Sequence, residues 1–191
     1  MIDFYSAYRK LNDLNSEVSC HYLISREGKI YNLLCPKFKG WHAGISEWKN
    51  VKNLNDYSIG IELENKGHEH GYTNFTNNQY HKLKQLIKFL KFNFNIKDED
   101  IIFHSDIAPN RKKDPGEKFI VKKLGIERFN FHQRKKFSIN RLLKFYGFSQ
   151  NYIKIHKADC IKAVKRSLNY KTIDSSISKN FKNKLNNLLF K

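Results

Sequence analysis

Long apolar runs are missing from this sequence of 191 residues, and no stretch approaches the length of a membrane span. The residues that follow Met1, IDFYSAYRK, lack the apolar middle of a signal peptide. We therefore expect a soluble chain without an export signal.

Cysteine is scarce and unpaired. The three residues Cys20, Cys35 and Cys160 form no CxxC pair, which argues against a disulfide framework and against a thiolate zinc site. We expect all three to be small, buried, apolar residues.

Acidic residues are half as frequent as basic ones, 18 Asp and Glu against 36 Lys and Arg, so the formal charge is +18. The excess favours an anionic partner such as nucleic acid, a membrane surface or an acidic cell-wall polymer. A composition rich in Lys, Asn and Ile could equally reflect the genome. Without a recognisable module, charge alone does not support specific nucleic-acid binding, and we expect none.

The length suits one well-buried domain with a small appendage. Phe4, Tyr8 and Leu11 have helical spacing, and Thr76 with Gln79 forms a capping box ahead of a long amphipathic helix that runs to Phe94. Strands are expected at 20–25, 29–34, 57–63 and 101–103, the first two joined by a tight turn at Arg26-Glu27-Gly28. Strands interleaved with a helix predict an α/β or α+β domain that ends near Gly125.

The strand at 57–63, YSIGIEL, combines two features. Alternation puts Ser58, Gly60 and Glu62 on one face and the apolar residues on the other. A glycine inside a strand indicates close approach by other backbone. Glu62 is thus expected on the less apolar face.

The segment 104–116, HSDIAPNRKKDPG, should be a stiff loop at a strand end, because Pro109 and Pro115 restrict the backbone and the residues before them. Such a loop can hold His104 and Asp114 in a fixed relation, and an imidazole and a carboxylate are suitable zinc ligands. Lys112 could point at the same space. A polar loop in which His104 merely caps a strand remains an alternative.

The last third of the chain has a different pattern. Residues 126–137 read as a basic linker, although Phe129, Phe131 and Phe137 must be covered by something. Three short amphipathic helices follow within 138–191 and should form a small bundle, with a cap at Ser178 for the last of them.

Four segments together resemble the zinc-dependent N-acetylmuramoyl-L-alanine amidases of the AmpD-like (amidase type 2) group, which are related to peptidoglycan recognition proteins. They lie in the family's order and are SEVSCHYLISREGKIYNL (16–33), GWHAG (40–44), NDYSIGIELEN (55–65) and HSDIAPNRKKDPG (104–116). The resemblance implies an α/β fold, a mixed central sheet flanked by helices, for an amidase domain at 1–125. It also likens 138–191, behind the linker at 126–137, to a three-helix peptidoglycan-binding module, with an undedicated helical appendage as the alternative.

The resemblance also implies a site. His104 and Asp114 correspond to zinc ligands, Glu62 to the general acid/base, Lys112 to the residue that stabilises the transition state, and Trp41 and His42 to the substrate groove. The implied reaction is hydrolysis of the amide between N-acetylmuramic acid and L-alanine. In the mechanism that the resemblance implies, zinc would polarise the carbonyl and acidify a bound water, Glu62 would move the proton, and Lys112 would stabilise the oxyanion.

Simpler roles stay open for each of these residues. Glu62 could be a solvated strand carboxylate, with Glu64 on the same face as a rival; His42 could only stack on Trp41; and Lys112 could be one charge of a solvated loop. Asp106 is better explained as a hydrogen-bond acceptor that organises its loop. His68 and His70 are better explained as polar loop residues than as metal ligands.

One departure from the family matters most. The family's first zinc-ligand His lies on a strand upstream of the segment that corresponds to 18–24, and residues 1–17 contain no His. His21 matches a position that is not a ligand. Either the sequence starts late, at an internal Met, or the protein has lost a ligand and a strand. The alternative function is therefore a truncated or degenerate, non-catalytic peptidoglycan-binding protein. We expect a monomer that acts on peptidoglycan or muropeptides in the bacterial cell envelope or periplasm, or in the cytoplasm if Met1 is the true start.

Overall fold

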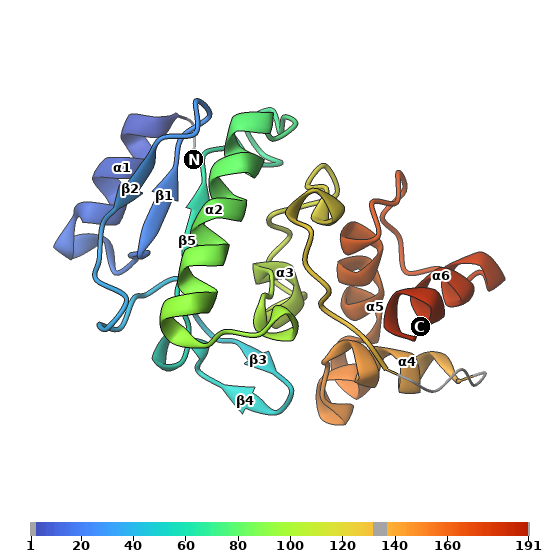
Figure 1. Cartoon of the computed structure of the whole chain (residues 1–191). Coiled ribbons are helices and arrows are strands. Elements are labelled where there is room, and N and C mark those ends of the chain that lie inside the picture. The colour runs from blue at the N-terminus through green and yellow to red at the C-terminus, as the bar shows by residue number, and fades with distance from the viewer. Residues whose placement is uncertain (1–2, 132–136, 191) are drawn as a thin grey trace. The chain divides into compact units, whose positions relative to one another are not determined.

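The computed structural model describes residues 3–131 and 137–190 (Figure 1). The chain divides into two compact units, and each is described by itself. The first unit comprises Met1–Ile45 and Asn53–Asn95, and the second comprises Ser46–Lys52 and Ile96–Lys191. From sequence we expected domain boundaries at residues 125 and 137. These boundaries stay a prediction, because the two compact units describe how the chain packs and not which segments are domains.

A three-stranded sheet forms the centre of the first unit. Its order is β2-β1-β5, with β1 (Tyr22–Ile24) antiparallel to β2 (Ile30–Asn32) and parallel to β5 (Ile61–Leu63). The expected hairpin is confirmed, and Gly28 in its turn has a φ of 88°, a conformation that glycine adopts without strain. Both faces of a sheet with a parallel pair are normally covered by helices.

Two helices supply that cover. In Figure 1 the sheet lies between α1 (Phe4–Asn12) and α2 (Asn77–Phe94). Leu11 of α1 is buried in a cluster with Cys20 and Leu23, against which Phe4 and Tyr31 also pack. Since Leu23 and Tyr31 are direct neighbours across β1 and β2, α1 covers the face of the sheet that carries Leu23.

Helix α2 begins as expected from sequence. Thr76 accepts a hydrogen bond from the Gln79 N–H at 3.1 Å, and the Gln79 side chain accepts from the Thr76 N–H at 3.0 Å. The buried side of α2 carries Tyr80, Leu83, Leu86, Ile87 and Leu90, which is the periodicity that predicted the helix.

The second unit contains a hairpin that we did not predict. Strands β3 (Glu47–Trp48) and β4 (Val51–Lys52) are joined by Lys49 and Asn50, both at positive φ, as a two-residue hairpin turn requires. The Lys49 N–H donates to the Gly147 carbonyl at 2.9 Å. A Cβ on Gly147 would lie 2.4 Å from the Trp48 ring, so this glycine lets the hairpin pack against the helical segment.

Three helices follow one another in the C-terminal part of the second unit, as expected from sequence. They are α4 (Ile139–Tyr146), α5 (Gln150–Ser167) and α6 (Lys179–Leu189), each with a serine N-cap: Ser138, Ser149 and Ser178. Their shared core contains fully buried leucine and aromatic side chains from α4 and α6, namely Leu142, Leu143, Tyr146, Phe181, Leu185 and Leu189.

Short elements complete the fold. They are the single helical turn α3 (His104–Ile107) and the 3-10 turns Leu14–Ser16, Leu54–Asp56, Asp98–Asp100 and Val121–Leu124. No helix among the described residues is long and apolar enough to span a bilayer.

Two expectations need correction. The strand at 101–103 is not formed: the backbone is extended, but the Ile101 N–H bonds to the Asp98 carbonyl and the Phe103 N–H to the Asp106 carboxylate, so these donors are used locally. Cys35 is exposed because it lies in the loop after β2, whereas Cys20 and Cys160 are buried.

The expectation that the aromatic residues of the linker are covered is met in the part that the structure describes. Its described part, 126–131, is packed rather than free: Arg128 and Phe129 are buried, and Phe131 bridges to Phe190. Apolar aromatics placed among basic residues are covered here by the helices of the second unit. Residues 132–136 lie outside the described residues.

Candidate active site

The loop from His104 to Asp114 is closed on itself. His104 Nδ1 lies 3.0 Å from Asp114 Oδ2, and the Ser105 N–H donates to the Asp114 carbonyl at 2.9 Å. The first residues form the turn α3 rather than the continuous loop expected from sequence, because the Ala108 N–H bonds to the His104 carbonyl. The expected pairing of the imidazole with the carboxylate is present.

The electrostatics of this pair keep Asp114 ionised. Partial burial alone would raise the pKa of the Asp114 carboxyl, but the hydrogen bond and the charge of His104, with a smaller contribution from Lys112, bring the pKa below its ordinary value. Lys112 is half-buried, and its backbone N–H donates a hydrogen bond to the Ala108 carbonyl at 2.9 Å. The positive charge of Lys112 therefore helps to keep the Asp114 carboxyl ionised.

The side chain of Asp106 holds the start of this loop in place through hydrogen bonds. Its buried carboxylate accepts from the Phe103 N–H at 3.0 Å, from Arg128 Nη2 at 2.5 Å and from the Tyr146 hydroxyl at 2.7 Å. The role of loop organiser that we expected for Asp106 is confirmed. Buried polar groups that are fully hydrogen-bonded hold a unique local geometry, so Arg128 and Tyr146 fix the base of α3.

Arg128 itself is surrounded by rings. The centre of its guanidinium lies 4.6 Å from the Phe103 ring centroid and 5.1 Å from that of Phe129. Its Nε and Nη1 have no hydrogen-bond partner among the described residues. Burial favours the neutral form of Arg128, but the Asp106 charge outweighs this effect and raises the Arg128 pKa. Arg128 therefore stays charged in this buried position.

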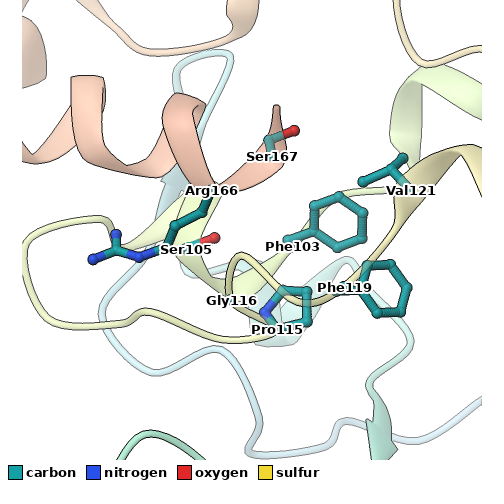
Figure 2. A pocket seen from close by; sticks show the side chains of 8 residues that line it. All are labelled: Phe103, Ser105, Pro115, Gly116, Phe119, Val121, Arg166 and Ser167. Atoms are coloured by element: carbon teal, nitrogen blue, oxygen red, sulfur yellow. The ribbon is translucent and has the colours of Figure 1, made fainter. Parts of the chain in front are cut away.

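Figure 2 shows a small cavity behind the same loop, where Ser105 near its start meets Pro115 and Gly116 at its end. Its volume of about 10 Å³ leaves room for at most one water molecule. This cavity is too small for a substrate.

In the first unit, the GWHAG loop is held by two polar side chains. Asn55 Oδ1 accepts from the N–H groups of His42, at 3.0 Å, and Ala43, at 2.7 Å, and Ser19 Oγ accepts from the Trp41 N–H at 2.9 Å. The Trp41 side chain is 56% exposed, with the Lys39 ammonium 4.4 Å from its ring centroid. The Trp41 ring is thus accessible to a ligand, and its role in a substrate groove stays a prediction.

His42 is less free than we expected. A Cβ on Gly60 would lie 2.4 Å from its ring, so the close approach at Gly60 is made by the His42 side chain and not by backbone. The His42 ring also packs edge-on against His21, with centroids 5.3 Å apart. The missing Cβ of Gly60 therefore determines where His42 lies.

His21 is a structural residue. Its Nδ1 accepts from the Gly60 N–H at 2.9 Å, so Nε2 carries the proton and donates to the Phe38 carbonyl at 3.0 Å. The ring is fully buried. Both ring nitrogens are occupied by backbone groups, so neither is available to a metal in this structure.

Glu62 lies in the middle of β5 and is half-buried. It is the direct neighbour of Leu23 in the parallel register, so its side chain is on the face of the sheet that α1 covers. Glu64, the rival by alternation, accepts from the Arg26 N–H through Oε2 at 2.8 Å. Glu64 therefore already serves the hairpin turn.

A larger cavity opens on this face. Its volume is about 320 Å³, and it is lined by side chains from α1, the hairpin turn, the end of β5 and the following loop: Asp3, Ala7, Arg26, Glu64, Asn65, Lys66 and Thr73. Ligand pockets for small molecules begin at about 300 Å³. Since Glu62 and Glu64 share a face of β5, the cavity lies on the face that carries Glu62.

The predicted site residues thus fall into two groups. Trp41, His42 and Glu62 belong to the first unit, and His104, Lys112 and Asp114 belong to the second. Within the described ranges, no three His, Cys, Asp or Glu side chains come together as a metal site. His68 and His70 are exposed and remain outside the site.

Sequence reasoning missed Asn55, Arg128 and Tyr146. Asn55 lies in a segment that we used only for its resemblance, and Arg128 was counted among the charges of a linker. The available signal for the last two was Asp106: an acidic residue that follows an apolar segment needs a donor when buried, and a basic residue flanked by aromatics is a suitable one.

Known proteins resemble the chain in sequence. It is 39% identical to the N-acetylmuramoyl-L-alanine amidase AmiD of Escherichia coli over 129 residues, which make up 61% of this chain and 46% of AmiD. It is 38% identical to the 1,6-anhydro-N-acetylmuramyl-L-alanine amidase AmpD of Haemophilus influenzae over 103 residues, 53% of this chain and 54% of AmpD. The chain spans about half the length of these curated relatives.

Solved structures agree with the fold over nearly the whole chain. A complex of E. coli AmiD with anhydro-N-acetylmuramic acid-L-Ala-D-γ-Glu-L-Lys matches with a TM-score of 0.82 at 28% identity, covering 98% of this chain and 84% of that one. AmpDh3 of Pseudomonas aeruginosa, in complex with anhydromuramic pentapeptide, matches with a TM-score of 0.80 at 25% identity, covering 98% and 86%. The expected fold class is confirmed.

The family model named N-acetylmuramoyl-L-alanine amidase (Amidase_2) matches residues 3–117, more than half of the chain. This range contains all four segments that carried the resemblance and all six predicted site residues. The chain therefore belongs to the N-acetylmuramoyl-L-alanine amidase family.

Proposed function

We propose that this chain hydrolyses the amide between N-acetylmuramic acid and L-alanine in peptidoglycan or muropeptides. The observation that carries the proposal is the His104–Asp114 pair, 3.0 Å apart on the loop of a chain that belongs to an amidase family. The AmiD complex holds a ligand with this linkage, which supports the choice of substrate.

In this proposal Glu62 transfers the proton, and Lys112 stabilises the negative charge that develops during the reaction. A carboxylate in the middle of a strand is held more rigidly than one on a loop, which suits a group that takes a proton from water and returns it to the departing amine. Lys112, next to Asp114, would stabilise the negative charge that develops on the amide oxygen. Trp41, largely exposed, would contact the sugar or the peptide beside His42.

The family suggests zinc as the cofactor. The side chains of the second unit are of a suitable type to bind zinc, but they are too few. His104 and Asp114 are suitable donors, whereas a catalytic zinc site normally has three protein ligands. Across the two described ranges no group of three such donors is assembled. His104 and Asp114 are the side chains of this chain that would contribute to a zinc site.

The test is cleavage of anhydro-N-acetylmuramic acid-L-Ala-D-γ-Glu-L-Lys, followed by liquid chromatography with mass detection. We expect release of the intact tripeptide by the unchanged chain and at least a 100-fold slower release by Glu62→Gln, because one proton-transfer residue contributes about 10²–10⁴-fold. Glu69→Gln, which removes an exposed loop carboxylate, is the matched control and should cleave normally. Equal rates for the two variants would remove Glu62 from the reaction.

A second candidate is a peptidoglycan-binding protein without catalysis. This alternative is favoured because the described residues assemble no group of three metal donors. Sedimentation with insoluble peptidoglycan distinguishes the two: binding without any release of peptide, with zinc present, supports this alternative.

The cell envelope or periplasm is the proposed compartment. It is supported by the resemblance of α4, α5 and α6 to a peptidoglycan-binding module, since such a module suits an enzyme that works on intact wall.

A further inference from the structure

The cavity of about 320 Å³ in the first unit contains a charge arrangement that the reaction does not use. Four of its lining residues are charged: Asp3, the N-cap of α1, Arg26 in the hairpin turn, and Glu64 and Lys66 just after β5. Their formal charges cancel. The donors and acceptors that remain unsatisfied, rather than the net charge, therefore decide what the cavity can bind.

The acidic side chains are mostly engaged by the fold. Both carboxylate oxygens of Asp3 accept hydrogen bonds from Ser6, from its N–H at 2.9 Å and from its hydroxyl at 2.7 Å. These bonds lower the Asp3 pKa and keep the group ionised as the N-cap of α1. Glu64 uses Oε2 for the Arg26 N–H and retains Oε1 as an acceptor.

The basic side chains keep most of their donors. Arg26 uses Nη1 for Thr73 Oγ1, at 3.0 Å, and for the Asn74 carbonyl, at 3.4 Å. Over the described parts of the chain, no interaction is found for its Nε and Nη2 or for the Lys66 ammonium. A guanidinium with free N–H groups beside an ammonium is suited to a carboxylate.

We propose that this cavity binds a carboxylate of the substrate's peptide stem, held by Arg26 and Lys66. The inference rests on the proposed function, because it takes the peptide from that substrate. The remaining Glu64 oxygen favours a peptide, which carries N–H groups, over phosphate, whose higher negative charge would be repelled by Asp3 and Glu64. The cavity lies on the Glu62 face of the sheet, so a stem bound there occupies the same face as the proposed acid/base.

The experiment measures binding of the tripeptide L-Ala-D-γ-Glu-L-Lys to the full chain by isothermal titration calorimetry. The peptide lacks the scissile bond, so the measurement does not depend on cleavage. We expect Lys66→Gln to weaken binding about 10-fold, as is typical for a lost charge-assisted hydrogen bond, and Lys66→Arg to restore most of it. Lys84→Gln, an equal loss of charge on the exposed side of α2, should bind as the unchanged chain does.

Two further arms test the chemistry. Arg26→Gln should weaken binding by a similar factor, with its circular dichroism spectrum and its unfolding midpoint checked because Arg26 also holds Thr73. The tripeptide with both carboxylates amidated should bind at least 10-fold more weakly, and acetate should not compete at equal concentration.

The outcomes separate this inference from the proposed function. Equal affinity for Lys66→Gln and Lys84→Gln, or for the free and amidated peptides, overturns the carboxylate site; acetate competing as well as the peptide reduces it to a general anion site and also overturns it. If the peptide binds as predicted and no muropeptide is cleaved, the proposed function fails and the site stands.

Discussion

His104 Nδ1 and Asp114 Oδ2 lie 3.0 Å apart although ten residues separate them in the chain. The turn α3 and the bond from the Ser105 N–H to the Asp114 carbonyl bring the two ends of the segment together. The geometry of the pair therefore depends on backbone hydrogen bonds as well as on the two side chains.

Removing the imidazole should raise the pKa of Asp114. Its pKa lies below the ordinary value because the hydrogen bond and charge of His104 outweigh the effect of burial. In the unchanged chain the carboxylate stays ionised until the pH falls below the ordinary value near 3.8, and the stabilisation it provides is lost only as the pH falls through the lowered pKa.

The measurement is the side-chain carboxyl ¹³C shift of Asp114 against pH in the unchanged chain and in His104→Ala. Asp3 is an internal control, since its lowered pKa comes from Ser6 and should not change. An Asp114 pKa that is the same in both proteins would contradict the pairing.

Breaking the buried ion pair below the loop should destabilise the protein strongly. Arg128→Met leaves the Asp106 carboxylate buried without its cation, and we expect a loss of about 3–5 kcal/mol of unfolding free energy. Arg9→Met, on the exposed side of α1, is the matched control and should change stability by less than about 0.5 kcal/mol. Urea unfolding measures both, and similar midpoints for the two variants would show that Asp106 is not stabilised by Arg128.

Tyr146→Phe removes one donor to Asp106 without opening a cavity. Burial and the neighbouring Asp106 charge raise the Tyr146 pKa, so the hydroxyl remains a donor throughout the accessible pH range. We expect a loss of about 1–3 kcal/mol, smaller than for Arg128→Met. Because the hydroxyl is not needed for packing, unchanged stability in urea would mean that it does not hold Asp106.

A methyl group at Gly60 should displace His42. The added Cβ would lie 2.4 Å from the His42 ring, and overpacking of this kind costs about 1–3 kcal/mol. The cost of Gly60→Ala should fall markedly in a His42→Ala background, where the ring is absent. Equal costs in the two backgrounds, measured as unfolding free energies, would contradict the contact.

Zinc should bind more weakly than to a site with three protein ligands, because two donors are assembled in the described chain. We expect calorimetry to give a weak one-to-one interaction that Asp114→Ala abolishes and Asp98→Ala does not. Tight binding that survives Asp114→Ala would place the metal elsewhere.

The fold was accessible from sequence where the signal is local. The capping box of Thr76 and Gln79, the turn at Gly28 and the N-cap Ser178 of the last helix depend on neighbouring residues, and all three were predicted correctly. The strand at 101–103 failed because its N–H groups bond locally to Asp98 and Asp106, which apolar periodicity does not reveal.

The site was accessible in part for the same reason. The pairing of His104 with Asp114 follows from residue types on one short loop. The contact of His42 with Gly60 and the burial of Arg128 against Asp106 depend on residues 18 or more positions apart, and no pattern within one segment encodes them.

Cleavage in H₂¹⁸O with zinc present shows which bond the chain hydrolyses and where the oxygen of water goes. If the chain is an amidase, anhydro-N-acetylmuramic acid-L-Ala-D-γ-Glu-L-Lys should yield a tripeptide with a free, unlabelled N-terminal alanine. One ¹⁸O atom should appear in the lactyl carboxylate of the sugar, because water attacks the carbonyl carbon of that amide. Intact substrate, or label in the peptide instead of the sugar, would contradict the account.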